Sequence, residues 1–360
     1  MNDKSFVILY PSKINLIYMM IVVGVLSILG NLIFYSEFGG AQFKYVMGIL
    51  IALMVYFLLR LTGGRLSTDA VFFEYKEKRW IVAFFEILSI IGFVISIILM
   101  KSYGFRGDLD FFDNLRHAKT ADNLNYYGTG HLGLMALVLS VYFKIKFNFI
   151  KAYFYLTVAL FSSLVAAERT GILYMAIIYF GFDYMSRQRV RLFNYIFIFI
   201  IVSALFYLIA LQTNKLYDSS GVLFVVAYFS YPLEALNSLN LNHIVISFSS
   251  VIGLFGLPLD FFISMPVSSP DDAGLFNVYS YVYKPLVVFG EFGFFILMGL
   301  MGLFLYTLEF VAGKSIVGAM AKLSFAFSVV MIFYDWTFHY YTHLYLIVFS
   351  FVLFGKYRFK

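Results

Sequence analysis

A short polar link between two apolar stretches holds the first residues whose types could do chemistry. It reads Ala167-Glu168-Arg169-Thr170. Inserting an arginine at membrane depth costs about 2.5–3.5 kcal/mol on insertion scales, so such a residue is usually paired with another group or functional. Glu168 cannot be taken as that partner, because adjacent residues of a helix do not face each other. One interpretation is a guanidinium fork for phosphate or diphosphate, with Thr170 capping the following helix; the other is an arginine that snorkels to the interface.

A second group, Asp335, His339 and His343, is spaced at intervals of four residues. That spacing puts the three side chains on one face if the segment is helical. A carboxylate and imidazoles together could act as a general base or bind a metal ion. The aromatic residues among them equally fit a belt at the membrane interface, where the aspartate and histidines only stay hydrated.

Residues 101–130 form a candidate polar surface for a carbohydrate. The segment mixes acidic residues with Arg106, Arg116 and other basic residues, and it also contains phenylalanines and tyrosines. The apolar faces of sugars stack on aromatic rings, and sugar hydroxyls pair with carboxylates. An ordinary solvated loop is the alternative interpretation.

The longest polar interruption of the chain runs from Gln212 to Lys284. It contains four prolines, five acidic residues and one histidine, His243. Loops of this length inside a compact architecture are usually functional or disordered. This one is too rich in Phe, Tyr, Leu and Val for a disordered segment. We therefore expect residues 212–284 to fold as a cap over a site.

The composition predicts a membrane protein with many spans. The 360 residues are 62% apolar and 13% charged, with a mean hydropathy of +0.87, which leaves too few polar side chains to cover a soluble surface. The chain has no cysteine, which excludes disulfides, thiolate metal sites and a cysteine nucleophile. The net charge of +6 fits an uneven distribution across a membrane better than binding to nucleic acid.

Runs of about twenty apolar residues, enough to cross about 30 Å of hydrocarbon, define the predicted architecture. The ten predicted spans are Ile14–Ser36, Phe43–Leu61, Trp80–Met100, His131–Phe143, Phe149–Val165, Gly171–Met185, Leu192–Leu211, Pro285–Phe310, Ile316–Tyr334 and Tyr341–Phe354. Gly221–Leu236 and Ile244–Phe262 would raise the number to twelve if they cross, although their prolines favour interfacial or re-entrant helices. The predicted fold class is all-α, with residues 1–360 as a single membrane domain.

The basic residues predict which side of the membrane each loop faces. Cytoplasmic loops carry most of the lysines and arginines of a membrane protein. With the N-terminus inside, 18 of the 26 basic residues fall on the cytoplasmic side, and the opposite orientation inverts this ratio. Both termini are then cytoplasmic, and the loops at 101–130 and 212–284 lie outside.

The chain resembles a known family in two respects. One is the layout of its spans with a large outer loop late in the chain, and the other is the sequence of three short stretches. They are Ala167-Glu168-Arg169-Thr170-Gly171-Ile172-Leu173, Phe276-Asn277-Val278-Tyr279-Ser280 and Phe289-Gly290-Glu291-Phe292-Gly293. The chain resembles the Wzy-type O-antigen polymerases, which join oligosaccharide repeat units. The resemblance implies a GT-C-like glycosyltransferase of the bacterial inner membrane, with its active site on the periplasmic side.

The resemblance also implies the substrates and partners. A growing glycan on undecaprenyl diphosphate would move onto a hydroxyl of one lipid-linked repeat unit, with inversion and without a metal, cofactor or nucleotide. The expected partners are therefore the lipid-linked donor and acceptor, membrane lipid and a chain-length regulator protein, and not nucleic acid.

The implied transfer needs a cation for the leaving diphosphate. Negative charge develops on the diphosphate as the bond breaks, and a positioned cation stabilises it. Arg169 is the first choice for this role, followed by Lys284 and by Arg106 or Arg116 of the 101–130 loop. Residues expected to bind substrate on the same resemblance also include Thr170, Asn277 and Tyr279.

The acceptor hydroxyl needs a general base. The candidates are Glu291, His243, Asp260 and His339. Glu291 lies a few residues into the predicted apolar helix Pro285–Phe310, so we expect its carboxylate to be desolvated, which raises a carboxyl pKa. The alternative is that Glu291 pairs with Arg169.

Two other functions stay open at this point. An O-antigen ligase shares the many spans, the large outer loop and the lipid-linked donor, but it uses lipid A core as the acceptor. A flippase or other transporter of lipid-linked oligosaccharide is the non-enzymatic alternative. Transporters often have ionisable groups near the midplane and repeated halves, whereas the acids of this chain are predicted mainly outside and its halves do not match.

Overall fold

The structure is a computed structural model of the chain, and it describes residues 4–35, 40–63, 70–76, 79–105, 111, 114–115, 118, 127–165, 169–186, 280–333 and 341–355. The predicted span Leu192–Leu211 and the segments Gly221–Leu236 and Ile244–Phe262 lie outside these ranges. So do nearly all of the 212–284 loop and most of the 101–130 loop.

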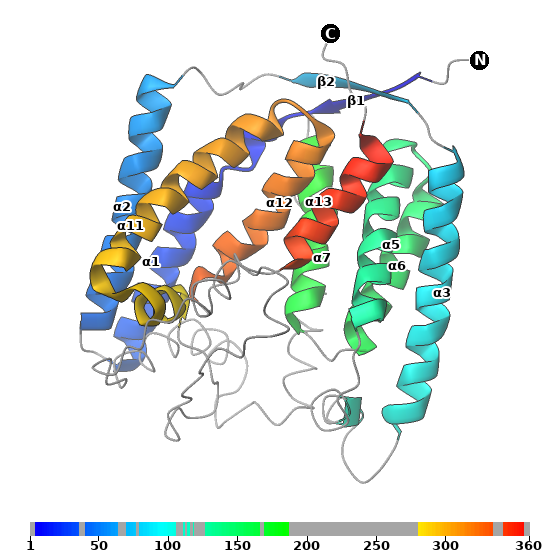
Figure 1. The fold of residues 1–360 in the computed structure, drawn as a ribbon, viewed down its shortest axis with the longest axis horizontal. Coiled ribbons are helices and arrows are strands. Elements are labelled where there is room, and N and C mark those ends of the chain that lie inside the picture. The colour runs from blue at the N-terminus through cyan, green and yellow to red at the C-terminus, as the bar shows by residue number, and fades with distance from the viewer. Residues whose placement is uncertain are drawn as a thin grey trace.

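Helices packed side by side make up most of the described molecule (Figure 1). Their bounds are α1 Leu16–Tyr35, α2 Gly40–Thr62, α3 Arg79–Tyr103, α5 Tyr127–Ile145, α6 Phe149–Val165, α7 Arg169–Ser186, α11 Ser280–Ala312, α12 Ile316–Val330 and α13 Tyr341–Phe354. Two short 3₁₀ helices are η1, Pro11–Lys13, and η3, Met331–Phe333. The predicted spans that fall on described residues agree with these helices to within a few residues, and α6 and α13 have the predicted bounds.

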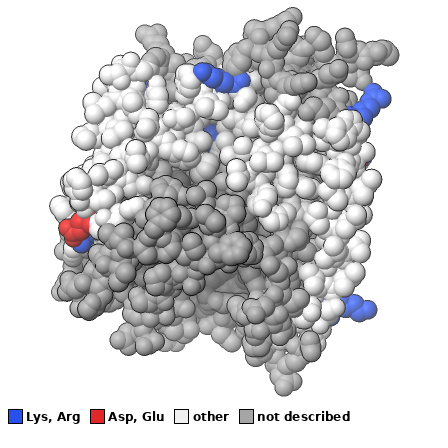
Figure 2. Space-filling model, viewed as in Figure 1, with Lys and Arg blue, Asp and Glu red and all other residues white. Residues whose placement is uncertain are grey.

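Four of the described helical segments are long and apolar enough to cross a membrane. They cover Pro11–Leu32, Gln42–Thr62, Arg79–Tyr103 and Phe289–Ala312. Shorter apolar helices accompany them, and many large apolar side chains stay exposed on the helices. In Figure 2 the described part of the surface is mostly uncharged, with few lysine, arginine or acidic side chains on it. These are the features of a helical membrane protein, because lipid rather than water covers such a surface.

A two-stranded antiparallel sheet departs from the predicted all-α fold. Strand β1, Lys4–Leu9, pairs with β2, Val71–Lys76, and Val7 lies opposite Phe73. Both strands are rich in apolar β-branched and aromatic residues, and both are too short to be recognised by a search for membrane spans. Val7, Leu9 and Phe73 are buried in the helix core. The sheet therefore lies across one end of the bundle, beside both termini (Figure 1).

Helix α12 lies between two hydrophobic clusters and belongs to both. One cluster joins α3, α5, α6, α7 and α13, and α12 contributes Leu323 and Phe327 to it. The other joins α1, α2 and α11, and α12 contributes Ala326 and Val329. Most of α12 is buried as a result. Its polar side chains must therefore find partners inside the protein.

Helices α2 and α11 approach closely at a glycine. A Cβ at Gly302 of α11 would fall inside van der Waals contact of the Ala52 carbonyl oxygen. Gly299, one turn earlier, has more room, because the nearest neighbouring atom, Val55 Cγ2, would be 3.7 Å from its Cβ. Close backbone approach at small residues is a common way for helices to associate in lipid.

Replacing these two glycines by alanine therefore gives a matched pair of variants. We expect Gly302→Ala to destabilise the protein by about 1–3 kcal/mol, because the added methyl group forces α2 and α11 apart. Gly299→Ala has space for its methyl group and retains the stability of the parent. Thermal unfolding of the purified variants in detergent measures the difference. Equal stability of the two variants would contradict the close contact at Gly302.

Candidate functional site

Helix α7 begins at Arg169, so the Ala167–Leu173 stretch does open a helix. The predicted cap at Thr170 is wrong, because the helix begins one residue earlier and Thr170 is already a helical residue. Thr170 lies in the first turn and is half-buried. At the other end of α7, the Met185 carbonyl accepts a hydrogen bond from the Tyr10 N–H at 2.7 Å, beside the sheet. The first turn of α7 therefore lies at the end of the bundle away from the sheet and both termini (Figure 1). In the predicted orientation this is the outer end.

A chain of hydrogen bonds runs from α7 through α12 to α13, near the same end. The hydroxyls of Tyr174 and Ser324 are 2.6 Å apart, and Ser324 Oγ is 2.7 Å from His343 Nδ1. On the other side of the ring, Ser328 Oγ is 2.9 Å from His343 Nε2. All four side chains are buried, and 2% of His343 is exposed. This chain, Tyr174–Ser324–His343–Ser328, is called the hydroxyl–imidazole chain below.

The local sequence explains how the hydroxyl–imidazole chain forms. Ser324 and Ser328 are four residues apart on α12, so both hydroxyls face the same neighbour. His343 lies in the first turn of α13, and its ring stacks on Phe325 with 4.4 Å between the ring centroids. The Tyr174 ring lies 5.7 Å from the imidazole. Aromatic rings therefore cover a polar chain that water does not reach.

The buried position of His343 corrects one prediction. An interfacial belt, in which this histidine only stays hydrated, is wrong for His343, because it is enclosed by α7, α12 and α13. Asp335 and His339 lie outside the described residues. Sequence reasoning did not identify Tyr174, Ser324 or Ser328, although the four-residue spacing of the serines in a buried helix was a usable signal.

Glu291 differs from its predicted environment. Helix α11 is interrupted at Gly290, whose φ of 68° lies in the left-handed region that favours glycine. Glu291 follows this break, and 64% of its side chain is exposed. It forms an ion pair with Lys44 of α2, 2.5 Å from Nζ to Oε1. The expected desolvation by an apolar helix is therefore wrong, and the partner that the structure gives to Glu291 is Lys44.

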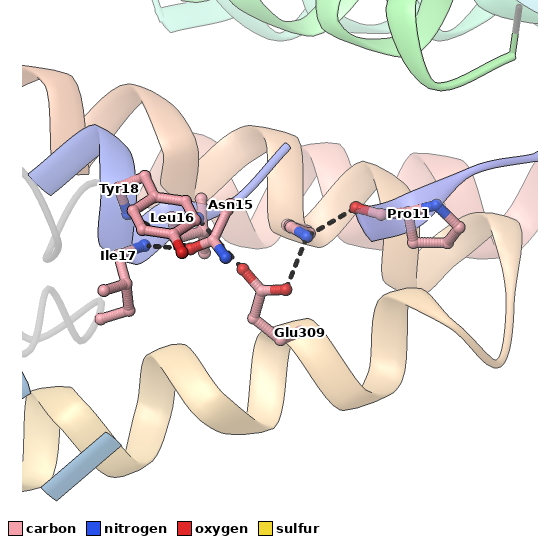
Figure 3. Close-up of polar contacts among 7 residues, drawn as sticks. Pro11, Asn15, Leu16, Ile17, Tyr18 and Glu309 are labelled. Atoms are coloured by element: carbon pink, nitrogen blue, oxygen red, sulfur yellow. Dashed lines mark hydrogen bonds and ion pairs between the residues drawn. The ribbon is translucent and has the colours of Figure 1, made fainter. Parts of the chain in front are cut away.

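A buried ion pair joins α11 to α12. Lys322 Nζ lies 2.9 Å from Glu309 Oε2, and the lysine side chain is fully buried. Lys322 also donates a hydrogen bond to the Pro11 carbonyl oxygen at 2.8 Å, and the Leu16 N–H donates to Glu309 Oε1 at 3.0 Å. Figure 3 shows Glu309 between the start of α1 and Pro11. The pair therefore holds the N-terminal segment against the hairpin of α11 and α12.

Lys322 is one of the 18 basic residues counted on the cytoplasmic side, and the structure shows that it is not at the surface, because its side chain is buried within the bundle. Glu309 and Lys322 are thirteen residues apart, on two helices of one hairpin. The start of α1 is also capped, since Asn15 Oδ1 accepts hydrogen bonds from the N–H groups of Ile17 and Tyr18 (Figure 3).

The other predicted site residues are only partly covered by the structure. Lys284 lies near the start of α11. Residues outside the described ranges are Arg106, Arg116, His243, Asp260, Asn277, Tyr279 and His339. Among the described residues, no group of histidines and carboxylates is arranged to hold a metal ion. Of the predicted residues, the structure thus places Arg169 and Thr170 one turn from the hydroxyl–imidazole chain, whereas Glu291 contacts α2.

Breaking the buried ion pair tests its role in the fold. We expect Lys322→Met or Glu309→Gln alone to cost about 3–5 kcal/mol of stability, because each leaves a buried charged partner uncompensated. The double variant, Lys322→Met with Glu309→Leu, removes both charges and should recover most of that loss. Protein recovered from membranes and thermal unfolding in detergent measure both effects. A double variant as unstable as the single variants would show that the two residues act separately.

Comparison with known proteins returned no match: no protein-family model, no curated protein and no solved structure matches the chain. Any function assigned to the chain therefore rests on its own residues and geometry.

Proposed function

We propose that the protein is a glycosyltransferase that uses a polyprenyl-diphosphate-linked oligosaccharide as its donor. In this proposal a growing glycan moves from undecaprenyl diphosphate to a hydroxyl of a lipid-linked repeat unit, as in O-antigen polymerisation. The reaction takes place at the periplasmic face of a bacterial inner membrane, and a chain-length regulator is a further expected partner.

The observation that carries the proposal is the start of α7. Arg169 is its first residue, Thr170 lies in its first turn, and buried hydrogen bonds one turn further on link α7 to α12 and α13. A helix start carries unpaired N–H groups and a positive dipole end, so it favours a phosphate group. An arginine at the same place adds a planar fork of donors. A rigid support behind this turn keeps such donors in place as charge develops on the diphosphate.

Besides this cation, the proposed glycosyl transfer needs a general base from the protein. The hydroxyl of the acceptor attacks the anomeric carbon, the bond to the diphosphate breaks, and the configuration inverts. Among the described candidates for the base, Glu291 is exposed and accessible, although Lys44 is paired with it. His243, Asp260 and His339 are the other proposed bases.

One observation favours a transporter as the second candidate. The Glu309–Lys322 pair puts two ionisable groups inside the helix bundle, whereas the sequence had predicted the acids mainly outside. Paired ionisable groups within membrane helices often mark transport pathways. Here the pair is also bonded to the backbone of Pro11 and Leu16, which favours a structural role.

Deleting the gene separates these functions. For a polymerase, a gel of the lipopolysaccharide should show the ladder collapsed to core plus one repeat unit, because export and ligation remain intact. A core without any repeat unit, with polymer accumulating on the lipid carrier, would instead identify a ligase. A core without repeat unit and with no polymer on the carrier at the outer face would favour the transporter. An unchanged ladder would contradict all three.

Arg169→Lys tests the role of the guanidinium fork. We expect this variant to lose long-chain polysaccharide while remaining in the membrane, because lysine keeps the charge but not the paired donors. Arg79→Lys is a matched control, since Arg79 is the first residue of α3, and α3 begins just after β2, at the end of the bundle that carries the sheet (Figure 1). Complementation of the deletion strain, followed by the same gel and a membrane blot, measures both. A normal ladder with Arg169→Lys would rule out the diphosphate role.

A further inference from the structure

Every link of the hydroxyl–imidazole chain joins two groups that can each donate or accept a proton. Tyrosine and serine hydroxyls do both, and a neutral imidazole has one protonated nitrogen and one bare nitrogen. The three links measure 2.6, 2.7 and 2.9 Å. In each of the three hydrogen bonds, either of the two groups can therefore be the donor.

Two complete proton arrangements follow. In the first, Nδ1–H of His343 donates to Ser324, Ser324 donates to Tyr174, Tyr174 donates to the Thr342 carbonyl oxygen at 3.5 Å, and Ser328 donates to Nε2. In the second, Tyr174 donates to Ser324, Ser324 donates to Nδ1, and Nε2–H donates to Ser328. The Ser328 proton is then directed to a further acceptor. The arrangements differ in the imidazole nitrogen that carries the proton.

We propose that Tyr174, Ser324, His343 and Ser328 form a proton relay across α7, α13 and α12. A proton arrives at Tyr174 Oη, the Tyr174 proton passes to Ser324, and the Ser324 proton passes to His343 Nδ1. The Nε2 proton passes to Ser328, and the Ser328 proton leaves. One proton enters and one leaves, so the chain gains no net charge in a buried site, where an isolated charge would be costly.

The surroundings of the chain suit a relay. Phe325 stacks on the imidazole and Phe327 lies 6.5 Å from it, so the ring is shielded while its two nitrogens stay in contact with hydroxyls. Thr170 is half-buried and lies one turn before Tyr174 on the same face of α7. Its hydroxyl is the proposed point at which a proton reaches the relay from the first turn of α7.

The source of the proton rests on the proposed function. During glycosyl transfer the acceptor hydroxyl loses its proton as its oxygen bonds to the anomeric carbon and the diphosphate leaves with the bonding electrons. The relay would take up that proton near Thr170 and release another from Ser328, which lies close to the end of α12. His343 acts at a distance from the reacting atoms in this scheme and is a proton-relay residue, not the residue that contacts the substrate.

The tautomers of His343 test the relay without any assay of activity. The full-length protein is labelled with ¹⁵N-histidine in lipid nanodiscs, and the signals of His343 are identified by their loss in His343→Gln. A relay predicts that both ring nitrogens show averaged shifts, between those of protonated and bare nitrogens. Tyr174→Phe should shift the population toward the Nε2–H tautomer, because Ser324 then has Nδ1 as its remaining acceptor in the chain.

Tyr45→Phe is the matched control. Tyr45 is also a buried tyrosine, and its hydroxyl donates to a serine, Ser27, at 3.3 Å, but it lies on α2 outside the chain. The control variant should leave the His343 signals unchanged. A single tautomer in the parent protein that does not respond to Tyr174→Phe would overturn the relay and would show that the chain only ties three helices together.

The link to glycosyl transfer is tested in the deletion strain. His343→Gln and His343→Asn keep an amide donor and acceptor but cannot shuttle a proton, so polymer formation should fall about 10²-fold, the low end of the usual contribution of proton transfer. Membrane level and thermal stability should stay near those of the parent. Full polymer with either amide would overturn the catalytic use of the relay. If the deletion itself leaves the ladder unchanged, the proposed function fails, and the tautomer measurement still decides whether the relay exists.

Discussion

An ammonium group buried in an apolar bundle must have a partner, and the arrangement around Lys322 follows from this constraint. The cost of leaving such a charge unpaired is several kcal/mol, which is comparable with the whole stability of many domains. Glu309 neutralises the charge, and the Pro11 carbonyl oxygen accepts a further hydrogen bond from the ammonium group. The second carboxylate oxygen of Glu309 holds the first N–H of α1. One ion pair thus joins α11, α12 and the N-terminal segment.

Helix α12 makes a different kind of polar contact on its other side, where neutral hydrogen bonds replace the ion pair. Lys322 bonds to Pro11 and to Glu309 of α11, whereas Ser324 and Ser328 bond to His343 of α13. Helix α12 is therefore held by a charged contact on one side and by neutral hydrogen bonds on the other. The neutral hydrogen bonds extend from Ser324 to Tyr174, which lies one turn after the first turn of α7. A site at that turn would be supported by the most completely buried helix of the described bundle.

The polar residues near the bundle fall into distinct environments, and this separates their plausible roles. Glu291 is exposed and follows a break in α11, so its carboxylate is accessible to a substrate, and it is paired with the more covered Lys44. The hydroxyl–imidazole chain is buried, so it suits proton movement or support rather than direct binding. The proposed transfer between two lipid-linked glycans would use both kinds of group, one that contacts the substrate and one that keeps the contacting residues in position.

The sequence by itself determined the class of the protein and the course of most described helices. Hydropathy is a local property, and a run such as Phe149–Val165 is recognisable without its neighbours, which is why α6 has the predicted bounds. The helix predicted at Gly171–Met185 is present for the same reason, although it begins two residues earlier, at Arg169. Only the tertiary structure decided which polar groups meet, because a partner can come from anywhere in the chain. Lys322 bonds to Pro11 across 311 residues, and the two short strands become a sheet only when folding brings them together.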